Sequence, residues 1–284
     1  MEYVAPDLPA PIPTVQEITA APTGKDSRSS RSTCKFGPYF IKYGSDVYLE
    51  EGRNLLFLNQ NMNSGIPRLF ALWREENLGI TVIVQEYIDG ETLSHERWAT
   101  YSRVEKSTLV AQLKEFFSKL RGIKSPNYFG GPNEGFILEG FVGRRQLYGR
   151  PFIPACKTAN AWVNAMIECV YKVTDRGPRD RFNAFLKTLF HLALDGSTEP
   201  ETAVFTHSDL SLQNVMVRDG LVVIIDWENA GWYPRYWEYC NLVMRQDCIH
   251  GESDWETYID QFLDRHLLEL GWLFRFRTWA MCQG

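Results

Sequence analysis

The stretch from Val204 to Glu238 decides the fold, and it reads VFTHSDLSLQNVMVRDGLVVIIDWENAGWYPRYWE. Two short apolar runs, Val215–Val217 and Leu221–Ile225, flank the dipeptide Asp219-Gly220. Apolar runs on either side of Asp-Gly are typical of two strands joined by a tight turn. We therefore predict a β-hairpin, with its second strand returning beside the first.

Polar residues stand at the open end of this hairpin. Asn214 comes directly before the first strand, Asp226 follows the second, and Asp209 precedes Asn214 by five positions. The returning strand is expected to bring the Asn214 and Asp226 side chains together on one metal ion, with Asp209 nearby to receive a hydroxyl proton. Mg²⁺ prefers oxygen ligands of this kind. Such a set suits phosphoryl transfer, in which metal placement and alignment of the attacking hydroxyl dominate.

An Asx-rich turn would also explain Asp209 and Asn214 taken alone. Asp226 favours the metal site, because a carboxylate at the end of a buried aliphatic strand is costly unless it binds a cation. His207, in the same loop, is interpreted as a hydrogen-bonded structural residue and not as an acid or base.

Three segments between residues 39 and 87 predict a small mixed unit. The side chains of residues 39–43 alternate between two faces, as in a strand. A helix is expected next, because Glu51, Leu55 and Leu58 share one face. The β-branched run Ile80–Tyr87 predicts a further strand.

After Gly90 the periodicity becomes helical. Ser102 and Glu105 form a capping box ahead of one helix, and further helical periods cover residues 162–173 and 182–190.

A second capping box, Ser253 and Glu256, is expected to open one terminal helix that continues through Leu270. The pattern as a whole predicts an α+β chain with a small mixed α/β N-lobe and a larger, mainly helical C-lobe that contains the hairpin.

The domain boundaries follow from composition. Residues 1–33 are rich in Pro, Ala, Ser and Thr, which indicates a flexible or loosely docked N-terminal arm. Residues 34–90 are assigned to the N-lobe, and residues 91–284 to the C-lobe with the catalytic loop and the hairpin.

Over residues 36–270 the chain resembles the aminoglycoside phosphotransferase and choline kinase family, in particular its fungal phosphotransferase members. The matching motifs are His207-Ser-Asp209-Leu-Ser-Leu-Gln-Asn214, Ile225-Asp226-Trp227-Glu228, Ala230-Gly231-Trp232-Tyr233-Pro234 and Trp237-Glu238. The resemblance implies a two-lobed, protein-kinase-like fold and a kinase that uses ATP and Mg²⁺. It also implies Asp209 as the catalytic base, with Asn214 and Asp226 as magnesium ligands.

The resemblance extends upstream. Phe40-Ile-Lys42-Tyr-Gly44 is similar to the strand that supplies a phosphate-binding lysine, and Glu51 is similar to its partner on the helix. Gln85–Gly90 resembles the hinge, where backbone groups near Glu86 and Ile88 would bind adenine. Without the downstream motifs, Lys42 would be interpreted as an ordinary edge-strand lysine and Glu51 as a solvated helix residue.

Three departures from the family pattern stand out. Ser208 occupies a position that is usually Gly, which tightens a turn but is no ligand. No G-x-G-x-x-G precedes Lys42, so Ser29–Gly37 is the candidate for a phosphate-covering loop. The Lys42–Glu51 separation is shorter than in protein kinases, which favours the small-molecule branch.

Two acidic residues have alternative interpretations. Glu228 and Glu238 either bind the acceptor substrate, as acidic residues here do in relatives, or cap and pair within the helical lobe. The aromatic residues of the same stretch are interpreted as core packing in preference to a cage for a cation; they are Trp227, Trp232, Tyr233 and Trp237.

Composition limits the partners. A net charge of -5 gives no general attraction to nucleic acid. The six cysteines form no C-x-x-C pair and indicate reduced thiols. No apolar run is long enough to span a bilayer, so we expect a cytoplasmic protein without membrane contact, acting on ATP and a small-molecule hydroxyl acceptor.

The sequence disfavours two other functions. A catalytically inactive, nucleotide-binding pseudokinase scaffold would not need Asp209, Asn214, Asp226 and Lys42 together. A protein kinase is disfavoured because Ile-Asp-Trp replaces Asp-Phe-Gly and no A-P-E follows.

Overall fold

The computed structural model describes residues 2–22, 24–25, 30–138, 152–174, 188, 202–246 and 253–281. The chain divides into two compact units. The first comprises Met1–Thr92 and Val215–Glu228, and the second comprises Leu93–Asn214 and Asn229–Gly284. The helical period predicted at residues 182–190 lies outside the described residues, Thr188 apart, as does Ser29 of the candidate phosphate-covering loop.

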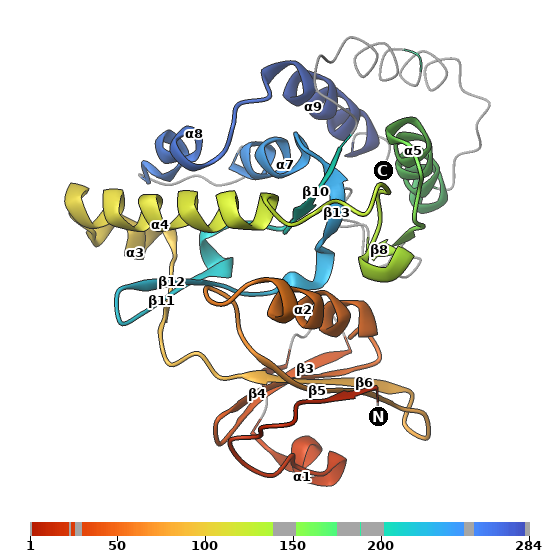
Figure 1. The fold of residues 1–284 in the computed structure, drawn as a ribbon, viewed down its shortest axis with the longest axis vertical. Helices are drawn as coiled ribbons and strands as arrows, with labels where there is room; N and C mark the ends of the chain where they lie inside the picture. The colour runs from red at the N-terminus through yellow and green to blue at the C-terminus, as the bar shows by residue number, and fades with distance from the viewer. Residues whose placement is uncertain are drawn as a thin grey trace. The chain divides into compact units, whose positions relative to one another are not determined.

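The first unit is built on a six-stranded antiparallel sheet with the strand order β1-β5-β6-β4-β3-β2 (Figure 1). Its strands are β1 (Tyr3–Val4), β2 (Gly24–Lys25), β3 (Arg31–Phe36), β4 (Tyr39–Gly44), β5 (Leu69–Glu75) and β6 (Ile80–Glu86). The strands predicted at residues 39–43 and 80–87 are therefore β4 and β6.

The two faces of the sheet are covered by different helices (Figure 1). On one face, Tyr39 and Ile41 of β4 form a core with Ile18 of helix α1 (Val15–Ala20). Lys42 alternates to the other face, which helix α2 (Leu49–Asn61) covers. The alternation in β4 thus places an apolar core on one side and a charged group on the other.

Helix α2 buries the face that the sequence predicts. Glu51, Leu55 and Leu58 are each no more than 2% exposed. The helix packs directly on β5, because a Cβ atom added at Gly52 would lie 2.5 Å from a methyl group of Leu72. This close packing fixes the position of the adjacent Glu51 over the sheet.

The structure differs from the predicted flexible arm over much of residues 1–33. Strand β1 pairs with β5 at the edge of the sheet. Helix α1 begins with a capping box formed by Thr14 and Glu17, and its Ile18 is fully buried. Apolar residues such as Ala5 and Ile18 in the core, together with the strand pairs β1–β5 and β2–β3, order the described part of this proline-rich segment. Average composition does not reveal these contacts.

The predicted hairpin is confirmed as β11 (Val215–Arg218) and β12 (Leu221–Ile224), in which Val215 pairs with Ile224. Its turn residues, Asp219 and Gly220, both have positive φ angles (52° and 76°), as a two-residue hairpin loop requires. Strand β7 (Glu91–Thr92) pairs with the outer edge of β11.

The hairpin belongs to the first unit, whereas the sequence assignment placed it in the helical lobe. Besides pairing with β7, it is tied to the loop after α2 by a hydrogen bond of 2.8 Å from the Ile224 N–H to the Gly65 carbonyl. These long-range contacts, and not the position in the chain, decide where it packs.

The second unit is mainly helical (Figure 1). Its helices are α3 (His95–Thr100), α4 (Arg103–Arg121), α5 (Ala159–Thr174), α7 (Trp237–Gln246), α8 (Ile259–Phe262) and α9 (Leu267–Met281). Short 3-10 turns are η1 (Pro132–Glu134), η2 (Leu212–Asn214) and η4 (Trp255–Tyr258), and η3 (Trp227–Asn229) lies at the boundary of the units. Its strands are β8 (Ile137–Leu138), β9 (Phe152–Ile153), β10 (Ala203–Thr206) and β13 (Gly231–Pro234).

Helix α4 is central to this unit and packs against α8 and β10. Its predicted capping box is present: the Ser102 hydroxyl accepts from the Glu105 N–H, and the Glu105 carboxylate accepts from the Ser102 N–H. Strands β10 and β13 pair in an antiparallel manner on either side of the catalytic-loop sequence. This pairing fixes the backbone that enters the loop at Thr206.

The prediction of a single terminal helix that begins at Ser253 and Glu256 is wrong. Helix α8 ends at Phe262, Leu263 is extended (φ -121°, ψ 143°), and α9 begins at Leu267. The apolar spacing continues across this break because Leu263 is itself buried, so periodicity alone does not reveal it.

The α+β fold class is confirmed: one unit combines an antiparallel sheet with helices, and the other unit is mainly helical. In the described part of the chain, no helix combines the length and apolar character that a membrane crossing requires.

Candidate active site

Lys42 and Glu51 form a buried ion pair within the first unit. The Lys42 ammonium on β4 donates a hydrogen bond to the Glu51 carboxylate on α2, and the two residues are 6% and 2% exposed. The pairing of these two residues, which the family resemblance implied, is therefore present in the structure.

Asp226 joins this pair from the end of the hairpin. Its Oδ1 atom lies 2.8 Å from the Lys42 Nζ atom. The Asp226 backbone is left-handed, with a φ angle of 66°, a conformation that costs a non-glycine residue free energy. The Asp226 side chain remains 26% exposed, so the carboxylate can still be reached by a ligand.

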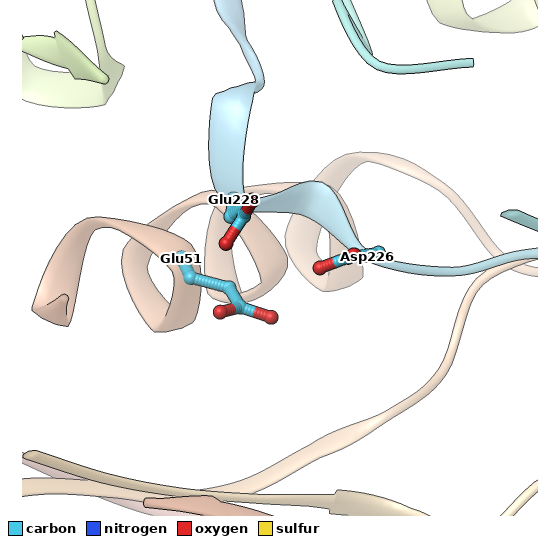
Figure 2. A group of neighbouring side chains, drawn as sticks. All are labelled: Glu51, Asp226 and Glu228. Atoms are coloured by element: carbon cyan, nitrogen blue, oxygen red, sulfur yellow. The ribbon is translucent and has the colours of Figure 1, made fainter. Parts of the chain in front are cut away.

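Three carboxylates gather at this point, from Glu51, Asp226 and Glu228 (Figure 2). One oxygen of each lies within 4.8 Å of the others. Glu228 pairs with the Arg31 guanidinium on β3 and is 2% exposed. Two cations against three carboxylates leave one net negative charge in the cluster.

Burial and the neighbouring opposite charges shift the pKa values of Lys42 and Glu51 in opposite directions. Burial raises the pKa of Glu51, although the neighbouring Lys42 ammonium lowers it. Burial alone would lower the pKa of Lys42, but Asp226 and Glu51 raise it above its ordinary value. The two neighbouring carboxylates therefore keep Lys42 in its charged form at neutral pH.

The predicted hinge follows β6. The Glu86 N–H donates to the Arg68 carbonyl at 2.8 Å, and the Glu86 carboxylate pairs with Arg218 at 2.5 Å. Ile88 is 5% exposed, and its backbone groups have no hydrogen-bond partner among the described residues. Of the two predicted hinge positions, Ile88 is thus the one whose backbone groups are unpaired among the described residues.

The residues of the predicted catalytic loop lie in the second unit. His207 is fully buried, and its Nδ1 atom accepts the Asp209 N–H at 3.1 Å. The Asn214 side-chain N–H donates to the Asp209 carbonyl at 2.7 Å. Asn214 is thereby oriented with its amide nitrogen toward the loop, which leaves the amide oxygen for another ligand.

Helix α7 holds this loop through polar residues on one face. The Glu238 carboxylate accepts the N–H groups of His207 (2.6 Å) and Ser208 (3.2 Å). The Asn241 amide donates to the Ser208 carbonyl, and the Trp237 indole N–H donates to the Ser208 hydroxyl at 2.9 Å. Burial raises the pKa of Glu238, and the electrostatic interactions with His207 and Arg121 and the two backbone hydrogen bonds oppose this rise.

Arg245, on the same helix, lies against Asp209. Its Nη1 atom is 2.5 Å from the Asp209 Oδ1 atom, and the two side chains are 28% and 14% exposed. Sequence reasoning missed Arg245. The available signal was its spacing from Glu238 and Asn241, since positions i, i+3 and i+7 share one helix face.

The acidic residues considered for the acceptor are both 2% exposed and already paired. Glu228 binds Arg31 and Glu238 binds the loop backbone, which favours the capping and pairing alternative. The aromatic residues considered for a cation cage are buried in the core: Trp227, Trp232, Tyr233 and Trp237.

The donor atoms fit a magnesium ion. Asp226 offers a partly exposed carboxylate, and one oxygen each of Glu51 and Glu228 lies within 4.8 Å of it; carboxylate oxygens are hard ligands that Mg²⁺ prefers. The buried Oε2 atom of Glu51, in the same carboxylate cluster as Asp226, has no hydrogen-bond partner among the described residues. The net negative charge of the cluster adds to this fit.

A strand lysine paired with a helix glutamate, a hairpin aspartate beside them and a His-x-Asp loop in a helical unit define the class of protein-kinase-like phosphotransferases. The chain belongs to the phosphotransferase enzyme family, whose model matches residues 31–273. No curated protein matches the chain.

Solved structures share the fold at low identity. The apo form of a thermostable mutant of aminoglycoside phosphotransferase APH(4)-Ia is 15% identical, with a TM-score of 0.60, covering 92% of this chain and 90% of that chain. The same enzyme as a ternary complex with ADP and hygromycin B is also 15% identical, with a TM-score of 0.59, covering 95% and 94%. A choline/ethanolamine kinase family protein from Mesorhizobium loti is 16% identical, with a TM-score of 0.54, covering 93% and 78%.

Proposed function

We propose that this protein is an ATP- and Mg²⁺-dependent kinase that moves the γ-phosphoryl group of ATP to a hydroxyl group of a small molecule. The observation that carries the proposal is the buried Lys42–Glu51 pair with Asp226 at 2.8 Å from the same ammonium. A scaffold has no need for this costly arrangement of buried charge.

Each residue has a distinct role in this proposal. Lys42, held by Glu51, binds the α- and β-phosphates. Asp226 and Asn214 would hold the magnesium ion, which when bound neutralises phosphate charge. The hairpin register supports this pairing, because Val215, next to Asn214, pairs with Ile224, two residues before Asp226.

Asp209 is proposed to orient the acceptor hydroxyl and take its proton as the oxygen attacks phosphorus. Its backbone is fixed by His207 and Asn214, so the carboxylate is presented in one orientation. Positioning of this kind supplies most of the rate in phosphoryl transfer. The adenine base is assigned to the backbone around Glu86 and Ile88.

The acceptor class is a small hydroxyl compound. The APH(4)-Ia structure above was crystallised with hygromycin B, and another aminoglycoside phosphotransferase with GDP and kanamycin. We therefore include aminoglycosides among the acceptors to be tested, and we compare GTP with ATP as the phosphoryl donor.

A phosphorylation assay on a panel of aminoglycosides, amino alcohols, sugars and hydroxy acids, read by mass spectrometry, tests the proposal. The wild-type protein should phosphorylate at least one compound in the presence of ATP and Mg²⁺. Asp209→Asn should lower that rate about 10³-fold with little change in ATP affinity. If no compound in the panel is phosphorylated, the result contradicts the proposed function. If Asp209→Asn keeps the wild-type rate, the result contradicts the role of Asp209 as the base.

A further inference from the structure

The catalytic loop lacks a cation of its own. Residues Thr206–Asn214 contain no Lys and no Arg. In phosphoryl transfer, negative charge spreads over the equatorial oxygens of the moving group, and positive groups aimed at those oxygens lower the barrier. Lys42 is assigned to the α- and β-phosphates, so apart from the proposed magnesium ion no cation has yet been assigned to the transferred group.

Arg245 is positioned to supply that charge. Its guanidinium lies 2.5 Å from the Asp209 carboxylate through Nη1. Helix α7 sets this position, because Glu238 and Asn241 on the same face bind the loop backbone at His207 and Ser208. The arginine is therefore fixed relative to the proposed base and not loosely placed on the surface.

The guanidinium has unused hydrogen-bonding capacity. A guanidinium carries five N–H donors. One is directed at Asp209, and the Arg245 Nε atom is buried without a hydrogen-bond partner among the described residues. The side chain is 28% exposed, so a substrate oxygen can reach it. A planar donor group of this kind matches a phosphoryl oxygen geometrically.

We propose that Arg245 is a catalytic residue that donates a hydrogen bond to a non-bridging oxygen of the transferred phosphoryl group. The inference rests on the proposed kinase function and on Asp209 as its base. An acceptor oxygen in hydrogen-bond reach of Asp209 stands about 3 Å from the phosphorus that it attacks. A guanidinium in contact with that carboxylate is then adjacent to the oxygens of the moving group.

The chemical step balances without any further reactant. The acceptor oxygen forms a bond to the γ-phosphorus, and the bond from that phosphorus to the β,γ-bridging oxygen breaks. The bonding electron pair leaves with ADP, and the acceptor proton passes to Asp209. Arg245 keeps its proton throughout and only stabilises the charge.

Water serves as the acceptor in the test, because ATP hydrolysis does not depend on which small molecule is the substrate. Phosphate release from Mg·ATP is measured for the wild type, Arg245→Gln, Asp209→Asn and the double variant. Arg265→Gln is the control, since Arg265 pairs with Asp260 at 2.6 Å on an exposed surface. Thermal shifts with Mg·ADP show that each variant folds and binds nucleotide.

Arg245→Gln should lower kcat about 10²- to 10³-fold and change the KM for ATP less than about 3-fold. It should lower the residual rate of the Asp209→Asn variant by a similar factor, because it acts on the phosphoryl group directly. Arg265→Gln should keep the wild-type rate.

Three results would overturn the proposal: an unchanged kcat, a change confined to the KM for ATP, or no effect of Arg245→Gln in the Asp209→Asn background. The last would make Arg245 a positioning residue for Asp209. If the wild-type protein neither hydrolyses ATP nor phosphorylates any panel compound, the proposed function itself is wrong. If the wild type is active and Arg245→Gln is equally active, only the role of Arg245 is wrong.

Discussion

At the residue scale, Ser208 is held in a backbone conformation that favours glycine. Its φ angle is 66°, and left-handed backbone costs a serine roughly 1 kcal/mol. The surrounding contacts hold it there: Glu238 accepts its N–H, and Trp237 donates to its hydroxyl at 2.9 Å. The hydroxyl bond explains how serine is accommodated where the family usually has glycine.

Comparing Ser208→Gly with Ser208→Ala separates this strain from the hydrogen bond. Both variants lose the bond from Trp237, but only glycine relieves the strain. We expect Ser208→Gly to be more stable than Ser208→Ala by about 1 kcal/mol, measured by urea unfolding. At the exposed helical residue Ser107 the order should reverse. A glycine variant less stable than the alanine variant at position 208 would contradict the observed backbone.

The residues that sequence reasoning found and missed differ in one respect. Lys42, Glu51 and Asp226 carry a local pattern, a strand, a helix face or a strand end, and the structure brings the three together. Arg31 and Arg245 meet their partners Glu228 and Asp209 across 197 and 36 positions of sequence. Helix spacing could place Arg245 on the face of Glu238 and Asn241, but only the folded chain shows which carboxylate each arginine meets.

At the element scale, helix α4 depends on its first turn. The Ser102 hydroxyl and the Glu105 carboxylate satisfy each other's backbone N–H groups, which would otherwise lack partners at a helix start. The hydrogen bonds from Ser102 lower the pKa of Glu105. The capping box is thus a contribution to stability that depends on an ionised carboxylate.

Ser102→Ala should lower the free energy of unfolding by about 1 kcal/mol at pH 7. A lowered pKa stabilises the fold above the unfolded pKa of Glu105, and this contribution disappears as the pH falls through the folded value. The penalty should therefore shrink below about pH 4, in urea titrations at several pH values. Ser107→Ala, further along the helix, is the control and should have little effect. A penalty independent of pH would argue against the role of Glu105.

Elements with a strong local signal were predicted closely, and those fixed by tertiary contacts were not. The hairpin, β4, α2 and α4 carry turn residues, alternation or caps, and the structure has them at the expected places. Helix α1, by contrast, is a short segment that Ile18 anchors under the sheet. The break at Leu263 also depends on packing. Leu263 is buried although it is not helical, so the apolar spacing looks the same with or without the break.

At the scale of the whole molecule, the chain leaves the helical unit at Val215, forms the hairpin in the sheet unit and returns after Glu228. The proposed roles are divided accordingly. Lys42, Glu51 and Asp226 belong to the first unit, and Asp209 and Asn214 to the second.

The rate of ADP formation from ATP, with and without Mg²⁺, tests the central claim most directly when wild type is compared with Asp226→Asn. Asp219→Asn is the matched control, because it makes the same change at the exposed turn of the same hairpin. We predict a Mg²⁺-dependent wild-type rate, a similar rate for Asp219→Asn, and a loss of more than about 10²-fold for Asp226→Asn with an unchanged melting profile. An Asp226→Asn variant that turns over ATP at the wild-type rate would contradict the assignment of this carboxylate to the metal, and with it the kinase mechanism.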